Sequence, residues 1–294
     1  MIDPPAARNR AHRLAGAAIL LLNKIRHDIR GYRTPRAFPV TAIDRAIEYD
    51  EAVVRRWTSA LEGYLGGAAP LEGKVVLELG PGADLGVGLI LLSRGAARYH
   101  AVDVHDLASR APWDLYETLL GRLGDDGSLR REIELARAGR GDRLDIMHSP
   151  GFDLSVLEGK GIDLVFSNAA LEHFDDLPDV ASRLARVLPA GAVMISLVDL
   201  QTHTRWIRDA DPLNIYRYSD RFYDALRFVG SPNRLRPREY RLIFEECGWR
   251  DVRAVPVSVL REGYLDTVRD GLIERFRGAD SQMHILSFLL CARS

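Results

Sequence analysis

The chain has 294 residues, which is enough for one large domain, or for a domain with a cap, and for a substantial core. Its 40 lysine and arginine residues nearly balance 41 aspartate and glutamate residues, so the net charge of −1 predicts no general affinity for nucleic acid or membranes. The two cysteines, Cys247 and Cys291, lie far apart and predict neither a disulfide framework nor a metal-ligand cluster. This cysteine usage predicts a reducing, cytoplasmic location.

Residues 1–69 are predicted to form a helical N-terminal extension. Five apolar residues share one face of its first helix: Leu14, Ala18, Leu21, Ile25 and Ile29. A basic amphipathic helix of this kind can bind a membrane surface, but packing over the main domain or against another subunit is the favoured interpretation. A homodimer through this helix is therefore one option. No apolar run is long enough for stable membrane insertion. A second helix is predicted over 43–61.

The stretch 74–86 has the pattern of a strand, a tight turn and a helix. An apolar, β-branched run reaches Glu78, a turn with Gly80 and Gly82 follows, and helix-like apolar spacing then resumes. Glycines let a ligand approach the backbone where a Cβ atom would block it. The first amides of the helix point at the turn, which makes this stretch a candidate binding site.

A second strand is predicted over 98–104 and carries Asp103, whose carboxylate can bind two vicinal ribose hydroxyls. Asp103 follows Gly80 by 103 − 80 = 23 residues, close to the roughly 20 expected in nucleotide-binding βαβ units. A dinucleotide is disfavoured because Leu85 occupies the last glycine position of its G-x-G-x-x-G pattern. In addition, Glu78 would repel a pyrophosphate but would suit a cationic amino group. A glycine turn without a ligand is the remaining alternative.

The remaining strands are predicted at five places: 143–148, 161–168, 192–199, 250–259 and 283–292. Helices between most of them predict an α/β fold with a doubly wound, mostly parallel sheet and ligands at the carboxyl ends of its strands. Two helices, 113–123 and 129–138, are interpreted as an insertion near the ligand at about 105–140. A second insertion, about 200–238, is interpreted as a substrate lid. The main domain is predicted to cover 70–294.

The acidic residue followed by Gly-x-Gly resembles the first motif of the class I S-adenosylmethionine-dependent methyltransferases. The sequence Asp-Leu-Val-Phe-Ser-Asn-Ala-Ala-Leu-Glu-His-Phe at 163–174 is similar to the fourth-strand motif of the small-molecule members. Asp84 departs from the family pattern, because many members carry a third glycine there. The resemblance covers about 73–294 and implies a Rossmann-like sheet of seven strands in the order 3-2-1-4-5-7-6, with the seventh strand antiparallel.

The resemblance implies S-adenosylmethionine as cofactor and S-adenosylhomocysteine as product. Its methionine end would lie at Glu78 and the glycine turn, and its ribose on Asp103. The carbonyl of Asn168 would accept from its amino group, and the adenine would lie beside the residues after the third strand. The implied cofactor-binding residues are Glu78, Gly80, Pro81, Gly82, Asp103, Val104, Phe152, Asp153, Asn168 and Ala169.

Methyl transfer to a hydroxyl requires alignment of the acceptor and removal of its proton. His203, oriented by Asp199 just after the fifth predicted strand, is the predicted general base. His173, after the fourth strand, is the second candidate. Each residue also has a purely structural alternative: a turn cap for Asp199, an exposed side chain for His203 and a helix-start hydrogen bond for His173. No metal is predicted, because zinc-ligand spacing is absent.

Residues 204–238 interleave six aromatic residues with eight arginines and four aspartates. Arginines and aromatic rings suit an anionic or sugar-bearing acceptor, although the aspartates would pair with some of the arginines. The expected activity is methylation of a small molecule, first of all O-methylation of a sugar or secondary-metabolite hydroxyl. A nucleic-acid substrate is disfavoured by the near-neutral charge and by Ala169-Ala170 after Asn168, where adenine methyltransferases carry Pro-Pro. The alternative is a non-catalytic adaptor that binds a partner through its N-terminal helix.

Overall fold

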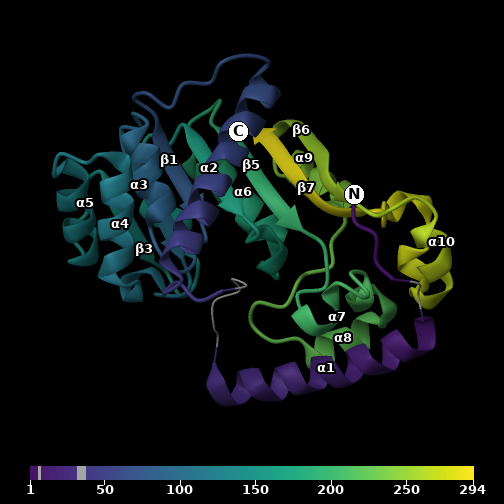
Figure 1. Ribbon diagram of the computed structural model, residues 1–294. Helices are drawn as coiled ribbons and strands as arrows, with labels where there is room; N and C mark the ends of the chain where they lie inside the picture. The colour runs from purple at the N-terminus through teal and green to yellow at the C-terminus, as the bar shows by residue number, and fades with distance from the viewer. Residues whose placement is uncertain (6–7, 32–37) are drawn as a thin grey trace.

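A seven-stranded sheet runs through the larger part of the molecule in the computed structural model, which describes residues 1–5, 8–31 and 38–294 (Figure 1). The strands are β1 (Val75–Leu79), β2 (Arg98–Asp103), β3 (Leu144–His148), β4 (Leu164–Asn168), β5 (Val193–Asp199), β6 (Arg250–Val259) and β7 (Ile285–Arg293). Their order is β3-β2-β1-β4-β5-β7-β6. β7 is antiparallel to both neighbours and the other pairs are parallel. The predicted doubly wound sheet and its order are confirmed.

The helices cover both faces of this sheet and also form a separate layer. They are α1 (Asn9–Arg30), α2 (Ile43–Leu65), α3 (Gly86–Ser93), α4 (Trp113–Leu123), α5 (Ser128–Arg137), α6 (Leu177–Val187), α7 (Arg205–Arg208), α8 (Asp220–Leu226), α9 (Pro237–Glu246) and α10 (Tyr264–Val268). Among residues 1–5, 8–31 and 38–294, no helix combines the length and apolar character needed to cross a bilayer.

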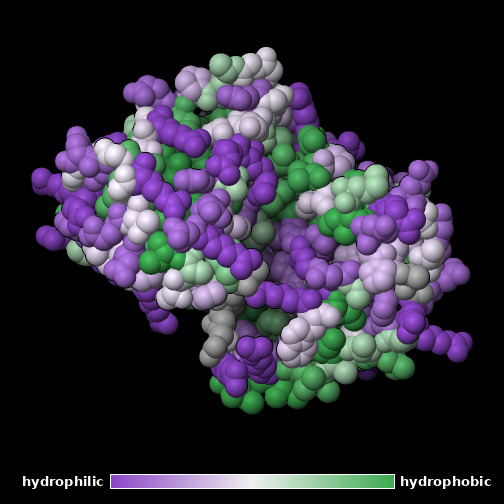
Figure 2. Space-filling view, in the orientation of Figure 1, coloured by the Kyte–Doolittle hydropathy of each residue, from purple (hydrophilic) through white to green (hydrophobic). Residues whose placement is uncertain are grey.

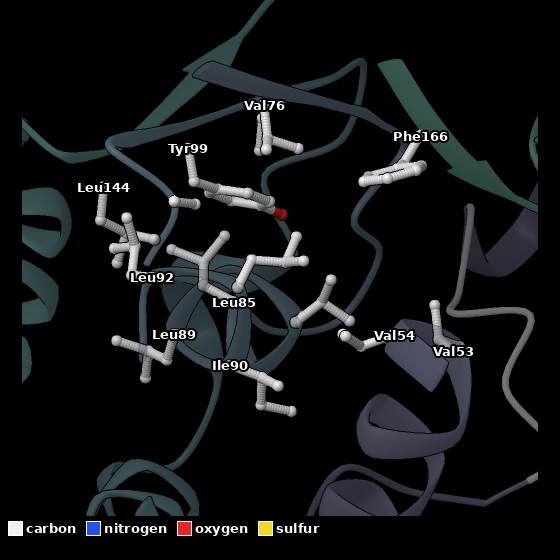
Figure 3. Packing of buried hydrophobic residues seen from close by; sticks show 14 of the residues in the cluster. Val53, Val54, Val76, Leu85, Leu89, Ile90, Leu92, Tyr99, Leu144 and Phe166 are labelled. Atoms are coloured by element: carbon white, nitrogen blue, oxygen red, sulfur yellow. The ribbon is translucent and has the colours of Figure 1, made fainter. Parts of the chain in front are cut away.

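Two apolar cores lie on opposite faces of the sheet because successive strand residues alternate in direction. Val76 belongs to the core under α2, α3, α4 and α5, whereas Leu77 belongs to the core under α6 and α9. Figure 3 shows the first of these cores, with Val53 and Val54 of α2 facing residues of α3 and the sheet. Trp57 stacks on Phe166 of β4 with ring centroids 4.8 Å apart. α2 is therefore an integral layer of the sheet unit, although its sequence lies in the predicted extension.

The predicted insertion at 105–140 belongs to this first core. Leu115 and Leu119 of α4 and Ile133 of α5 are buried in it, together with residues of α2 and α3. Within the described part of the chain, neither helix contributes to the ligand cavity described below. The predicted insertion reaches the cavity through His105 and Leu107, which precede the two helices. The helices α4 and α5 themselves turn their apolar faces to the sheet beside β3.

A smaller helical layer, the cap, comprises residues 9–30, 200–234 and 260–284 and includes α1, α7, α8 and α10. It lies at the lower right of Figure 1 and has its own core, which is rich in aromatic residues such as Tyr216 and Phe276. The segment predicted as a lid therefore forms a cap together with α1 and α10, which come from distant parts of the chain.

α1 packs against the rest of the cap through a face that its apolar pattern did not indicate. Gly16 and Leu20 are the buried residues of α1. A Cβ atom added to Gly16 would lie 2.0 Å from Asn214 Oδ1, so this close approach requires glycine. The five residues that share the apolar face lie on the opposite side, and the large ones among them are exposed.

Candidate active site

A cavity of about 510 Å³ opens at the carboxyl edge of β1, β2 and β4. Its size lies within the roughly 300–1,000 Å³ typical of small-molecule sites. The parallel register of these three strands brings their ends to one edge, since Leu79 pairs with both Val102 and Ser167. All but one of the predicted cofactor-binding residues line the cavity: Glu78, Gly80, Pro81, Gly82, Asp103, Val104, Phe152, Asn168 and Ala169.

The glycine turn has the left-handed backbone that its sequence predicts. Gly80 and Gly82 have φ of +71° and +76°, which other residues adopt at a cost. A Cβ atom at Gly82 would find no atom within 4 Å, so open space lies beside this residue. Asp84, at the position of the family's third glycine, is buried, and its Oδ1 accepts from Gly86 N at 2.9 Å. This hydrogen bond connects the turn to the first residue of α3 although position 84 is not a glycine.

Glu78 presents a buried carboxylate to the cavity from the end of β1. The hydroxyl of Tyr99, on the neighbouring strand β2, donates to Glu78 Oε2. Burial and the adjacent Glu78 carboxylate raise the pKa of Tyr99 well above its usual value, so Tyr99 remains a hydroxyl donor. A fixed carboxylate in a buried wall suits a cationic group on a ligand.

Asp103 holds its carboxylate beside the glycine turn. His105 N donates to its Oδ1 at 2.8 Å, and Gly82 N donates to its Oδ2 at 3.3 Å. Burial raises the pKa of Asp103, and these backbone hydrogen bonds oppose the shift. A carboxylate can accept about four hydrogen bonds, so Asp103 retains acceptor capacity for hydroxyl groups in the cavity.

α2 forms part of the cavity wall, which sequence reasoning missed. Tyr49 and Val53 line the cavity, and Asn168 Nδ2 donates to the Tyr49 hydroxyl at 2.7 Å. Arg56 Nη1 donates to Asn168 Oδ1 at 3.2 Å. Tyr49 lies off the apolar positions that predict the helix, so no local signal identified it.

Two residues of the wall have strained backbones. Phe152 and Ala169 have φ of +48° and +55°, in the left-handed region that costs non-glycine residues about 1–2 kcal/mol. Such strain concentrates at functional sites, where the surrounding structure maintains it. Both residues follow a strand, and both line the cavity.

Asp153 is the one predicted cofactor residue that does not line the cavity among the described residues. Its side chain is exposed and accepts from Ser155 N at 3.0 Å and from Ser155 Oγ at 2.9 Å. These hydrogen bonds lower the pKa of Asp153. The carboxylate stabilises the turn at Leu154–Leu157, which corrects the prediction that it faces the adenine.

The two candidate histidines lie beside each other, but they differ in access to the cavity. His173 lines the cavity, and within the described residues neither of its ring nitrogens has a hydrogen-bond partner. Burial lowers the pKa of His173. The ring of His203 meets it edge-on, with centroids 4.9 Å apart, and His203 is not part of the described lining.

The predicted Asp199–His203 pair does not form. Asp199 Oδ2 accepts from Arg208 Nη2 at 2.6 Å, and its Oδ1 accepts from Gln201 N at 3.0 Å. The carboxylate beside His203 is that of the buried Glu172, whose Oε1 lies 3.7 Å from His203 Nε2. Sequence reasoning noted Glu172 next to His173 but gave it no role.

His203 is held between two acceptors. Its Nδ1 lies 2.9 Å from the carbonyl oxygen of Gln201, which can only accept, so Nδ1 carries a hydrogen. Its Nε2 faces Glu172. Burial lowers the pKa of His203, but the nearby Glu172 and Asp199 carboxylates outweigh burial and raise it overall.

Glu172, His173 and His203 could also hold a metal ion. Each offers a ligand atom, and these atoms lie within 4.8 Å of one another. One carboxylate and two imidazoles suit a divalent transition metal. In a tetrahedral site, bonds of about 2.0–2.2 Å would place the ligand atoms about 3.3–3.6 Å apart, so the side chains would have to move closer together by up to about 1 Å to bind an ion. The sequence predicted no metal, because His203 lies far along the chain from the adjacent Glu172 and His173 and the three form no recognisable ligand spacing.

Several arginines of the predicted lid form ion pairs with carboxylates of the chain itself. Arg217 pairs with Asp211, Arg234 with Asp220, Arg208 with Asp199, and Arg227 with Asp175. This segment contributes Val229 and Gly230 to the described lining, and no arginine. The geometry therefore does not support the prediction of an arginine-bound anionic acceptor.

A family model described as "Methyltransferase domain" matches residues 128–196, from α5 through β5. A comparison with curated proteins found no match. Among solved structures, a SAM dependent methyltransferase from Aquifex aeolicus is 16% identical, covers 87% of this chain and 98% of its own, and has a TM-score of 0.46. Another from Mesorhizobium loti is 15% identical, covers 80% and 96%, and has a TM-score of 0.44. Likenesses this weak carry no argument about activity or substrate.

The family match covers the segment that contains the strand-four motif. The sheet order is the one that the family resemblance implied, and the glycine turn at the end of β1 has the left-handed backbone that its sequence predicts. Within residues 128–196 the chain is therefore similar to a methyltransferase domain, and its seven-stranded sheet has the strand order of a Rossmann-like methyltransferase fold.

Proposed function

We propose that the chain methylates a small-molecule acceptor, with a hydroxyl group of a secondary metabolite or sugar as the first candidate. The observation that carries this proposal is the cavity in which Glu78, Gly82, Asp103 and His173 lie together. Apolar residues such as Val53 and Val229 also line it, which favours an acceptor with apolar surface over an anionic one.

The cavity residues fit S-adenosylmethionine. The cofactor has a cationic amino group and ribose hydroxyls, which are donors, and the wall offers the carboxylates of Glu78 and Asp103 as acceptors. We assign Glu78 to the methionine end and Asp103 to the ribose. Gly82 leaves room for the ligand beside the turn, and Asn168 is assigned to the amino group through its backbone carbonyl. When bound, the cofactor supplies an activated methyl group on a positively charged sulfur.

His173 is our first candidate for the general base, because it lines the cavity and its lowered pKa keeps it neutral at pH 7. A ring nitrogen of His173 would accept the acceptor's hydroxyl proton. His203, the first choice from sequence, becomes the second candidate, because Glu172 favours its protonated form. The positive charge of His203 beside Glu172 would then fix the position of the neighbouring His173 ring.

A non-catalytic adaptor is the competing function. Side chains that fill the ligand pocket would favour an adaptor, whereas the open cavity of about 510 Å³ counts against one. A cytoplasmic location remains part of this proposal, and the free thiols of Cys247 and Cys291 are compatible with it.

Isothermal titration calorimetry with S-adenosylhomocysteine tests the binding step. We expect binding by the intact chain, and Asp103→Ala should weaken it by about 1–3 kcal/mol, because charge-assisted hydrogen bonds to the ribose are lost. Asp153→Ala is the matched control, since this nearby carboxylate does not line the described cavity, and it should bind as the intact chain does. Binding of NAD without binding of S-adenosylhomocysteine would point to a dehydrogenase instead.

Turnover distinguishes the enzyme from the adaptor. A metabolite extract incubated with the chain and a methyl-labelled donor should yield labelled small molecules, whose chemistry then identifies the acceptor. Intact S-adenosylhomocysteine binding with no labelled product from any fraction would support the adaptor.

A further inference from the structure

An apolar stripe runs along the outer face of α1. Leu14 and Ile29 are 74% and 75% exposed, and Leu21, Leu22 and Ile25 are each about half exposed. Figure 2 shows apolar surface along the lowest edge of the molecule, where Figure 1 places α1. Single exposed apolar residues are ordinary, but a continuous stripe of large ones marks an interaction surface.

The stripe is not needed to hold α1 in place. The inner face of the helix makes the contacts to the cap: Gly16 and Leu20 are buried, and Asn23 Nδ2 donates to Thr204 Oγ1 at 2.9 Å. Leu14 and Ile29 therefore project away from the chain's own contacts. An occupant outside the chain must cover them if their burial is to stabilise anything.

The charge on α1 indicates what that occupant is. The helix carries five basic residues and one acidic residue, Asp28, a net charge of +4 in a chain whose net charge is −1. Helical spacing places Arg10 and Lys24 on one flank of the stripe and Arg26 on the other. Arg26 and Arg30 line a shallow hollow together with Leu22, Ile25 and Ile29. Long basic side chains can rest on apolar surface while their charged ends reach outward.

We propose that α1 is an interfacial anchor that lays its outer face on an anionic membrane surface. Its apolar stripe would enter the boundary between headgroups and acyl chains, and the flanking basic residues would meet lipid phosphates. A second copy of the chain is a poorer occupant, because it would bring two helices of charge +4 face to face.

The anchor lies beside the rim of the cavity. His27 of α1 stacks on Phe228 with ring centroids 4.8 Å apart, and the next two residues, Val229 and Gly230, line the cavity. A membrane-bound α1 would therefore hold this rim close to the lipid. If the proposed methyl transfer is correct, the acceptor class is an apolar molecule that dissolves in the membrane; the docking itself does not rest on that function.

Vesicle co-sedimentation of the full chain tests the anchor. Vesicles of phosphatidylcholine with about one quarter phosphatidylglycerol should bind the chain, and added salt should weaken the binding by screening. Vesicles of phosphatidylcholine alone should bind it far less. The double variant Arg26→Gln and Arg30→Gln should lower partitioning by about 30-fold, given the usual contribution of basic residues near an anionic surface.

The apolar part of the anchor needs its own variant and control. Ile25→Ser with Ile29→Ser should lower partitioning by about 30-fold or more, because two large apolar side chains no longer enter the lipid. Val255→Ser with Val257→Ser is the matched control, since these β6 residues are 46% and 47% exposed, as Ile25 is at 47%. Both pairs should leave S-adenosylhomocysteine affinity unchanged, so a failure of cofactor binding would be seen separately.

Three outcomes would overturn the anchor. The intact chain could fail to bind anionic vesicles, or the Ile25/Ile29 variant could bind them as well as the intact chain does. Analytical ultracentrifugation could also reveal a dimer that the Ile25/Ile29 variant abolishes, with no vesicle binding, which would assign the stripe to a second copy of the chain.

Discussion

The sheet unit buries aliphatic side chains in two layers, whereas the cap closes its core around charged groups. In the sheet, Val76 and Leu77 turn to opposite faces and are fully buried. In the cap, Arg217 is equally buried and its Nε lies 2.6 Å from Asp211 Oδ2. Next to the cap, Arg236 at the start of α9 donates to the carbonyl oxygens of Ser281, Gln282 and Ile285, the first two of which belong to the cap.

This difference predicts that the two regions accept substitutions of their buried side chains to different degrees. An aliphatic core accepts another side chain of similar volume, because dispersion and burial do not depend on direction. A buried guanidinium has no such substitute, since its donors must each meet an acceptor and its charge needs a partner. We therefore expect the sheet unit to tolerate conservative change and the cap to be sensitive to it.

The largest expected effect tests which of the two regions supplies the base. His173 follows β4 of the sheet, and His203 follows β5 at the start of the cap segment. His173→Gln should lower kcat by about 10²–10⁴-fold, with S-adenosylhomocysteine affinity retained. His203→Gln should have the smaller effect. Initial rates with an identified acceptor measure both, and the reverse order would return the role to His203.

The pH dependence of kcat/KM tests independently whether His173 or His203 is the general base. A base must be unprotonated to act, so kcat/KM should rise with pH through the pKa of the free enzyme's base. For His173 this limb should lie below the usual 6.5, because burial lowers its pKa. For His203 it should lie above 6.5, because the neighbouring carboxylates raise its pKa. Loss of activity on chelation, restored by a divalent ion, would instead indicate that both histidines bind a metal with Glu172.

The next largest effect should come from the charged core of the cap. Arg217→Met leaves the buried Asp211 carboxylate without its cation and should cost about 3–5 kcal/mol in the free energy of unfolding. Urea unfolding followed by fluorescence and circular dichroism measures this loss. Arg238→Met is the control, because Arg238 and Asp280 form an exposed pair worth at most about 1 kcal/mol. Equal losses for the two variants would contradict the importance of the buried pair.

The smallest effects belong to conservative changes in the aliphatic cores. Leu77→Ala should cost about 2–5 kcal/mol through the cavity it leaves, whereas Leu77→Met should cost less than about 1.5 kcal/mol. Arg217→Lys is also a conservative substitution, because it keeps the positive charge. It should nevertheless lower the free energy of unfolding more than Leu77→Met does, because one ammonium cannot reproduce the two contacts of the guanidinium with Asp211. Equal stability of Arg217→Lys and Leu77→Met in urea would contradict the expectation that the cap tolerates conservative substitutions less well than the sheet unit.

Most of the sheet could be predicted because its signals are local. The apolar runs at 164–168 and 193–199 lie within the predicted strands, and β6 matches its predicted bounds. The strand order, by contrast, came from the family resemblance, because periodicity alone does not say which strands are neighbours. Asp103 and the glycine turn could be predicted for the same local reason.

What sequence reasoning missed depends on partners distant in the chain. Tyr49 reaches the cavity only because α2 packs on the sheet, and Glu172 replaces Asp199 beside His203 because Arg208 occupies Asp199. The arginines of the predicted lid suggested an anion site because the sequence does not show which groups they contact in the fold. Arg236, for example, is satisfied by carbonyl groups of residues 281–285, more than forty positions away.

The position of β7 has a consequence for synthesis on the ribosome. β7 follows β6 in the chain, yet it lies between β5 and β6 and pairs with both. Until residues 285–293 have left the exit tunnel, β5 has an open edge and β6 has no neighbour in the sheet. Open strand edges invite pairing with other chains. A nascent chain paused before this segment would therefore be prone to aggregate, and insertion of one late strand would remove that risk.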